Sequence, residues 1–143
     1  MKLPDTNVLI YAVNTDAPQH GVARAWMAAA LAAPAGVGFA WVALLGFVRI
    51  CTHPSVLQRP LRPADAFEVL HFWLGEPRAR VLHPTATHAT TLGALLARAG
   101  TGGNLCTDAH LATLAIEHGA TLASFDHDFH RFDALAFERL RAD

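Results

Sequence analysis

Short apolar runs alternate with longer helical segments along the whole chain, and this alternation restricts the fold more than any other feature. Strand-like runs occupy residues 2–6, 37–40, 80–82 and 121–124, and a weaker one lies at 135–139. Helical patterns occupy residues 8–13, 18–31, 41–52, 63–74, 85–99 and 104–118. Strands that alternate with helices favour a mostly parallel sheet of four or five strands, covered on both faces.

The composition predicts one domain that covers some apolar surface with a partner. The chain has 143 residues, which fits a single domain over 1–143. Hydrophobic residues make up 52% of it and charged residues 16%, which is apolar for a protein that stays a monomer. The net charge of −1 gives no overall basic character that would indicate nucleic-acid binding.

One uncharged stretch, residues 25–48, is long enough to span a membrane. The run PAGVG at 34–38 interrupts it, so we predict a helix end, a turn, a strand and a new helix. Asp5 stands where the apolar part of a signal peptide would begin. Cys51 and Cys106 fit no metal or redox spacing. We therefore expect a cytoplasmic protein without a membrane segment.

Two acidic residues follow predicted strands. Asp5 lies near the end of the first strand, and Asp126 lies just beyond the fourth, in TLASFDHDF. The carboxyl ends of parallel strands meet at one edge of the sheet, and ligands bind outside that edge. Both side chains are therefore expected at one edge.

A third acid, Asp108, belongs to the helical segment NLCTDAHLATLAIEHG. Its neighbours at helical spacing include Leu105, Leu111 and Ala112, so Asp108 lies on the face that points inward. The alternative is a partly buried acid that the helix N-terminus stabilises.

Three carboxylates at one edge would repel one another strongly. At ~5 Å and an effective dielectric of ~20, each pair costs about 3 kcal/mol, or on the order of 10 kcal/mol for three pairs. A domain is stable by only about 5–15 kcal/mol. Such a cluster needs extra protons or a cation, and Mg²⁺ or Mn²⁺ suits oxygen ligands.

The chain resembles the PIN domain, specifically the VapC-like toxin ribonucleases of prokaryotic toxin–antitoxin pairs. Three segments carry the resemblance in the right order, namely LPDTNVLIYAVN, WVALLGFVRICTHP and GGNLCTDAHLATLAIEHGATLASFDHDFHRF. The resemblance implies a three-layer α/β/α sandwich and hydrolysis of RNA phosphodiester bonds that depends on Mg²⁺ or Mn²⁺. It also implies a homodimer that a small antitoxin protein neutralises.

The resemblance assigns roles to individual residues. Asp5, Asp108 and Asp126 match the family's catalytic, metal-binding acids, and Asp128 matches a secondary metal-binding acid. Three small polar residues fall where ligands or water are commonly oriented, namely Thr6, Asn7 and Ser124. The alternative roles are a helix cap for Thr6 or Asn7 and a strand-end hydroxyl for Ser124.

The sequence departs from the family at two positions. The family usually has a Glu where this chain has Gly46, and no acid occurs between Asp16 and Asp65. The substitution predicts either a site with more water ligands or a weak enzyme, and close packing can explain a glycine there. Arg49, three residues on, can bind the scissile phosphate or form a structural ion pair. Pro4 cannot donate a ladder bond, which predicts a local bulge.

Other patterns have simpler explanations. In DHDFH (126–130), we expect a turn with exposed histidines rather than a metal site. Gly102-Gly103 can form a phosphate-binding loop, but a flexible helix entry is the simpler interpretation. Some of five aromatic residues can form a groove for an antitoxin helix, with the rest in the core: Trp26, Trp41, Phe47, Phe72 and Trp73.

Two other functions compete with the nuclease. Phosphoryl transfer to Asp5, as in receiver or haloacid-dehalogenase-like domains, normally needs a lysine late in the chain, but Lys2 is the only lysine. The other alternative is a weakened PIN-fold module that binds RNA or protein, which Gly46 favours.

Overall fold

The computed structural model describes residues 1–100 and 105–142, and its centre is a parallel sheet. The strand order is β3-β2-β1-β4-β5, and every neighbouring pair is parallel. The strands are β1 (Lys2–Pro4), β2 (Val37–Phe39), β3 (Ala79–Val81), β4 (Thr121–Ser124) and β5 (Phe137–Arg139). The predicted parallel sheet is therefore confirmed, including the weaker fifth strand.

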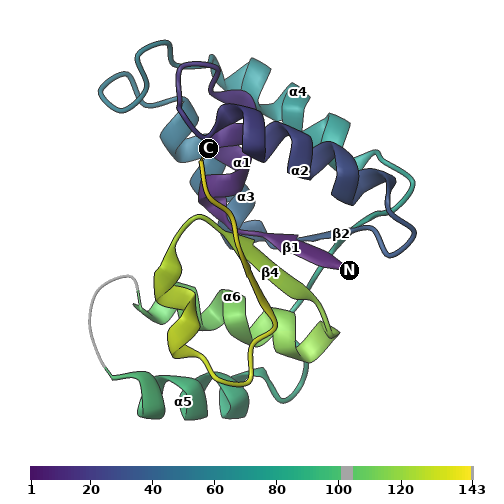
Figure 1. Ribbon diagram of the computed structural model, residues 1–143, viewed down its shortest axis with the longest axis vertical. Helices are drawn as coiled ribbons and strands as arrows, with labels where there is room; N and C mark the ends of the chain where they lie inside the picture. Colours follow the sequence, from purple (N-terminus) through teal and green to yellow (C-terminus); the bar gives the residue numbers. More distant parts are fainter. Residues whose placement is uncertain (101–104, 143) are drawn as a thin grey trace.

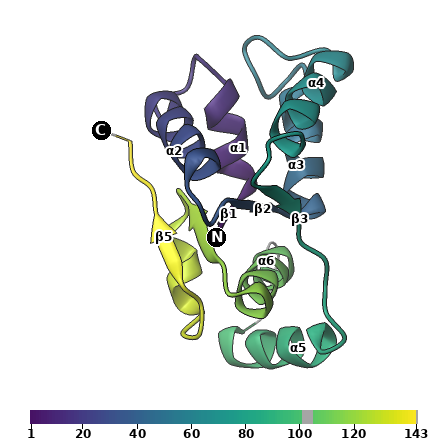
Figure 2. The ribbon, with the colours of Figure 1, turned by 90° about the vertical axis from the view of Figure 1, so that its right-hand side faces the viewer.

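Helices cover both faces of this sheet. They are α1 (Thr6–Val13), α2 (His20–Ala32), α3 (Trp41–Cys51), α4 (Pro63–Leu74), α5 (His88–Ala99) and α6 (Leu105–His118), with a 3₁₀ helix η1 (His127–Arg131). Figures 1 and 2 show α1 to α4 on one side of the strands and α5 with α6 on the other. This is the predicted three-layer α/β/α sandwich.

Each helix layer encloses its own apolar core. Between the sheet and α1 to α4 lie the buried side chains of Phe39, Phe47 and Trp73. On the other face, Leu111 and Leu122 pack with other buried residues of α6, β4 and η1. Because both faces of the short strands are buried, their residues form continuous apolar runs rather than an alternating pattern.

The junction of β1 and α1 differs from the prediction in two details. The carboxylate of Asp5 caps α1 by accepting a hydrogen bond from the Thr6 N–H at 2.7 Å, so neither Thr6 nor Asn7 is the cap. The register of β1 with β4 runs without a break through Pro4, so the predicted bulge is absent there. The Asp5 N–H donates to the carbonyl of Ala123 in β4 at 2.9 Å. Successive backbone nitrogens of a strand face opposite neighbours, so Pro4 faces β2, where pairing has already ended.

The uncharged stretch at 25–48 is divided among α2, β2 and α3, as predicted. In the described part of the chain, no helix is both long and apolar enough to cross a membrane. The predictions at Gly102-Gly103 and for a helix start at Asn104 lie outside the described residues.

Candidate active site

A polar depression of about 570 Å³ opens at the carboxyl ends of β1 and β4. Seven of the eight site residues predicted from the sequence line it. They are Asp5, Thr6, Asn7, Arg49, Asp108, Asp126 and Asp128. The eighth, Ser124, is completely buried and hydrogen-bonds to three of them. The structure thus brings together side chains from the β1–α1 junction, α1, α3, α6, the end of β4 and the segment after it.

Asp5 is held in place by hydrogen bonds and has no arginine partner among the described residues. Its carboxylate accepts from the Thr6 N–H at 2.7 Å and from the Ser124 hydroxyl at 2.8 Å. Burial raises the pKa of Asp5 above its ordinary value, these two hydrogen bonds oppose the rise, and the charge of Asp126 adds to it. A cation in the depression would offset this penalty on the charged form.

The hydroxyl of Ser124 connects the two strand ends. It donates to Asp5 Oδ2 at 2.8 Å and accepts from the Asp126 N–H and the Asn7 side-chain amide, each at 3.0 Å. The Asn7 carbonyl oxygen accepts from the Phe125 N–H at 3.2 Å. Asn7 and Ser124 therefore fix the position of Asp5 relative to Asp126.

Asp108 lies in the first turn of α6 and faces the other acids. Burial, together with the negative charges of Asp5 and Asp126, raises the pKa of Asp108 to about 6. The positive charge of Arg131 opposes the rise, and Asp128 adds to it. A carboxyl group with a pKa near 6 can exchange a proton near neutral pH.

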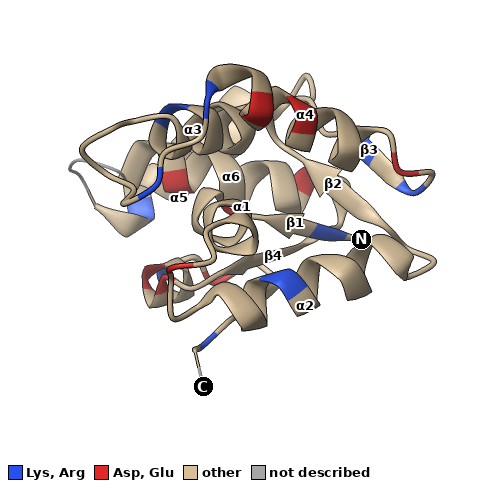
Figure 3. Ribbon diagram, turned by 90° about the horizontal axis from the view of Figure 1, so that it is seen from above, with Lys and Arg blue, Asp and Glu red and all other residues tan. Residues whose placement is uncertain are grey.

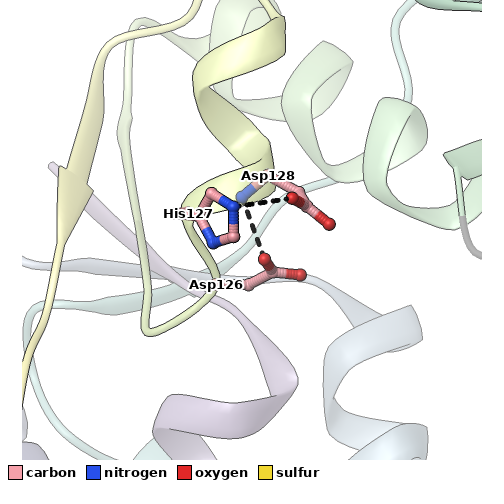
Figure 4. Close-up of side chains that lie close together, drawn as sticks. All are labelled: Asp126, His127 and Asp128. Carbon is pink, nitrogen blue, oxygen red and sulfur yellow. Dashed lines mark hydrogen bonds and ion pairs between the residues drawn. The ribbon is translucent and has the colours of Figure 1, made fainter.

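The segment after β4 forms a compact group of possible metal ligands (Figure 4). Asp126 caps η1 by accepting from the Asp128 N–H at 2.9 Å, and His127 Nε2 lies 3.3 Å from Asp128 Oδ1. Among the described residues, only Asp126, His127 and Asp128 offer three ligand atoms that all lie within 4.8 Å of one another. Asp5, Asp108 and Asp126 share the depression, but their carboxylates do not form a group with all ligand atoms within 4.8 Å of one another. His127 is exposed, as expected, and so is His130.

Gly46 packs directly against Thr6. A Cβ atom at position 46 would lie 2.9 Å from both Thr6 Cγ2 and Thr6 Oγ1, which is too close without movement. Close packing, one of the explanations that the sequence allowed, therefore accounts for the glycine. A second hollow of about 530 Å³ adjoins the depression here and shares Thr6 and Arg49 with it.

Arg49 is exposed and forms no ion pair with any described residue. The alternative role for Arg49 was a structural ion pair, and no such pair is present among the described residues. A second cation that was not predicted from the sequence, Arg131, lines the depression and pairs with Asp128 at 3.2 Å. The spacing of three residues between Asp128 and Arg131 could have indicated it, had a helical turn been predicted there.

The donors around the depression suit a hard divalent cation. Carboxylates from three separate segments line the depression, and the hydroxyl of Thr6 and the amide of Asn7 line it too. The available metal donors are therefore mainly oxygen atoms. Mg²⁺ and Mn²⁺ prefer this ligand chemistry and tolerate several water ligands. Figure 3 shows Lys and Arg positions at separate places along the described ribbon, interspersed with Asp and Glu positions.

Lys2 lies at the opposite end of β1 and pairs with Glu138 at 2.7 Å. It is therefore remote from the acids. Phosphoryl transfer to Asp5 would need a lysine near them, so the position of Lys2 argues against this alternative.

Comparison with known proteins places these features in a family. Residues 2–135 match the model of the PIN domain. The chain is 45% identical over 139 residues to Ribonuclease VapC37 of Mycobacterium tuberculosis, covering 97% of this chain and 96% of that protein. It is 40% identical over 132 residues to Ribonuclease VapC33 of the same species, covering 92% of each.

Solved structures share the fold at low sequence identity. VapBC2 from Rickettsia felis bound to a promoter DNA fragment superposes with a TM-score of 0.64 at 18% identity, covering 96% of this chain and 97% of the other. FitAB bound to the IR36 DNA fragment gives a TM-score of 0.66 at 18% identity, covering 97% and 94%.

Proposed function

Because the chain belongs to the PIN domain family and to its VapC-type group, we propose that it is a metal-dependent endoribonuclease and the toxin of a toxin–antitoxin pair. The relatives are named ribonucleases, and this name indicates the proposed reaction class. One structural observation supports the proposal most directly. Carboxylates that are far apart in the sequence, Asp5, Asp108 and Asp126, line one depression at the carboxyl edge of the sheet.

We expect Asp5, Asp108, Asp126 and Asp128 to hold Mg²⁺ or Mn²⁺. When bound, such an ion lowers the pKa of a coordinated water and polarises a phosphate oxygen. The charge it brings would also offset the burial, and the weaker mutual repulsion, that raise the pKa values of Asp5 and Asp108.

The residues around the acids supply the remaining requirements for phosphodiester hydrolysis. Arg49 and Arg131 line the same depression, and a guanidinium can bind the scissile phosphate with two parallel hydrogen bonds. The carboxylate of Asp108 faces the depression and can accept the proton of the attacking water, while the leaving oxygen takes a proton from solvent as its bond to phosphorus breaks. Ser124 and Asn7 keep Asp5 in position without contacting the phosphate.

Cleavage of a defined RNA tests the proposal. We expect the wild-type protein to cleave RNA with Mn²⁺ or Mg²⁺ and to stop when EDTA removes the ion. Asp5→Asn and Asp108→Asn should each abolish cleavage. The control is Asp65→Asn, because Asp65 is a partly exposed acid of α4 that pairs with Arg62, and this variant should cleave as the wild type does. Full activity of Asp108→Asn would rule out the mechanism.

The neutralising partner is expected to be a small antitoxin, consistent with the VapBC and FitAB complexes that share the fold. An apolar hollow of about 500 Å³ between α1, α2 and α4 suits one face of a partner helix. Phe72 lines the hollow and is 63% exposed, whereas Phe47 and Trp73 are buried in the core. Trp26 and Trp41 do not line this hollow, so Phe72 alone of the five aromatic residues considered combines exposure with a place in it.

A weakened nuclease that acts mainly by binding is the second candidate. It is favoured by Gly46, because Thr6 occupies the space that a side chain at this position would need. Metal binding without detectable RNA cleavage would support this candidate.

A further inference from the structure

A second cluster of polar side chains, outside the acid depression, joins α5 to α6. His88 begins α5, while His110 and Glu117 belong to α6. His88 Nδ1 lies 2.6 Å from Glu117 Oε1, and His88 Nε2 lies 2.9 Å from His110 Nδ1. The side chains of Glu117 and His88 are only 4% and 12% exposed. The proposed nuclease function gives this cluster no role.

Glu117 fixes the orientation of the His88 ring. An ionised carboxylate only accepts hydrogen bonds, so His88 Nδ1 must be the donor in this contact. The other carboxylate oxygen accepts from the Thr85 N–H at 3.3 Å and from the Thr85 hydroxyl. With both oxygens engaged, Glu117 cannot rotate freely. A neutral His88 therefore presents the lone pair of Nε2 towards His110.

The two facing nitrogens have nearly the separation of two ligands on one metal ion. Bonds of about 2.1 Å from a transition metal to two imidazoles place the nitrogens ~3.0–3.4 Å apart at angles of 90–109°. The observed 2.9 Å is within a few tenths of an ångström of this range. At this distance, either one imidazole nitrogen donates a hydrogen bond to the other, or both nitrogens bind the same cation. A histidine whose second nitrogen donates to a carboxylate is also the usual arrangement around bound metals.

We propose that His88 Nε2 and His110 Nδ1 form a binding site for a transition-metal ion such as Zn²⁺ or Ni²⁺, with Glu117 orienting His88 and water completing the coordination. This site does not rest on the nuclease proposal, because its nitrogen donors select different ions from the oxygen donors of the acid depression. A bound ion would join α5 to α6, whose first turn carries Asp108.

Anomalous diffraction from crystals soaked in Zn²⁺ with excess Mg²⁺ tests the proposal on the unaltered protein. Data at the zinc edge should show a peak between His88 and His110, within bonding distance of both nitrogens. A peak only at Asp126, His127 and Asp128, or no peak between the two imidazoles at a Zn²⁺ concentration that fills other sites, would overturn the proposal.

Zn²⁺ titration of single variants provides the matching test in solution. His110→Ala should remove one Zn²⁺-binding event. Glu117→Gln keeps both ligands and should lower the Zn²⁺ affinity of this site by about 10–100-fold. His71→Ala removes an exposed imidazole on α4 and should bind as the wild type does. Circular dichroism confirms that each variant is folded. An unchanged isotherm for folded His110→Ala would contradict the proposal, and the crystal soak decides if that variant does not fold.

Discussion

At the scale of single residues, the surroundings of Asp108 disfavour its charged form. Its pKa of about 6 means that the folded protein binds this proton more tightly than the unfolded chain does. In metal-free protein the ionised form therefore destabilises the fold. The penalty grows as the pH rises from about 4, the pKa of an unfolded Asp, to about 6 and is constant above that.

We predict that Asp108→Asn stabilises the metal-free protein at pH 7.5 and that this gain disappears below pH 4. The side chain is partly exposed, so solvent screening limits the gain to on the order of 1 kcal/mol. Urea unfolding of both proteins in EDTA, measured from pH 3.5 to 8, provides the comparison. A stability difference that does not change with pH would contradict the argument.

A second prediction concerns the buried hydroxyl of Ser124. Ser124→Ala leaves the Asp126 N–H and the Asn7 amide without their partner, which should cost about 1–3 kcal/mol of unfolding free energy. It should also raise the pKa of Asp5 further, because a hydrogen bond that lowers this pKa is lost. Urea unfolding and NMR titration of the Asp5 carboxyl measure the two effects.

Thr113→Val is the matched control for Ser124→Ala. Thr113 is equally buried, and its hydroxyl donates only to the Ala109 carbonyl of its own helix, at 2.7 Å. This substitution leaves no buried donor without a partner and lies outside the depression. Equal losses of stability in the two variants, with no change at Asp5, would contradict the role given to Ser124.

At this scale, the sequence predicted which acids converge but not how each is held. Asp5 and Asp126 follow strands of one parallel sheet, so their shared edge follows from topology alone. The cap at Asp5 and the Ser124 hydrogen bonds depend on side-chain rotamers, which sequence spacing does not determine. Arg131 was missed because its segment was expected to be a turn, whereas Asp126 starts a 3₁₀ helix there.

At the scale of secondary-structure elements, the contact between α1 and α3 depends on Gly46. Gly46→Ala would gain about 1 kcal/mol in helix propensity, but its Cβ would lie 2.9 Å from Thr6. Overpacking of this kind typically costs about 1–3 kcal/mol. We therefore predict a net loss of stability for Gly46→Ala, measured by urea unfolding.

The double variant Thr6→Ala/Gly46→Ala isolates this contact. Removing the Thr6 side chain makes room for the new methyl group, so the double variant should be more stable than the sum of the single effects predicts. If the two effects are simply additive, Gly46 and Thr6 do not constrain each other as the structure indicates.

Most elements were predictable because proline, glycine and apolar periodicity mark their ends. Pro63 begins α4, as expected, and β3 differs from its predicted bounds by one residue. The first strand proved shorter than predicted, because the Asp5 cap starts α1 at Thr6. These differences arise where a side chain, rather than the apolar pattern, decides the boundary.

At the scale of the whole molecule, the exposed apolar side chains indicate that partners cover part of the surface. Trp41 and Leu45 lie one turn apart on α3 and are 42% and 56% exposed. Leu45 also lines the hollow that adjoins the acid depression. Because the separate hollow at Phe72 is the one we propose for the antitoxin, we propose that a second copy of the chain covers the α3 surface.

We predict that the protein sediments as a dimer with twice the 15.4 kDa mass of the chain. Trp41→Ser combined with Leu45→Ser should shift it to the monomer, because the apolar area that drives association is lost. Phe72→Ser on α4 is the control and should remain dimeric. Monomeric wild-type protein at every concentration would contradict the expected homodimer.

Our main claim is that carboxylates from separate segments form a single site for a divalent cation. Calorimetric titration of the wild-type protein with Mn²⁺ at pH 7.5 tests it directly, with Asp65→Asn as the control. We predict saturable binding by both, and loss of that binding in the Asp5→Asn/Asp108→Asn double variant. Failure of folded wild-type protein to bind millimolar Mn²⁺, or unchanged binding by the double variant, would contradict the claim.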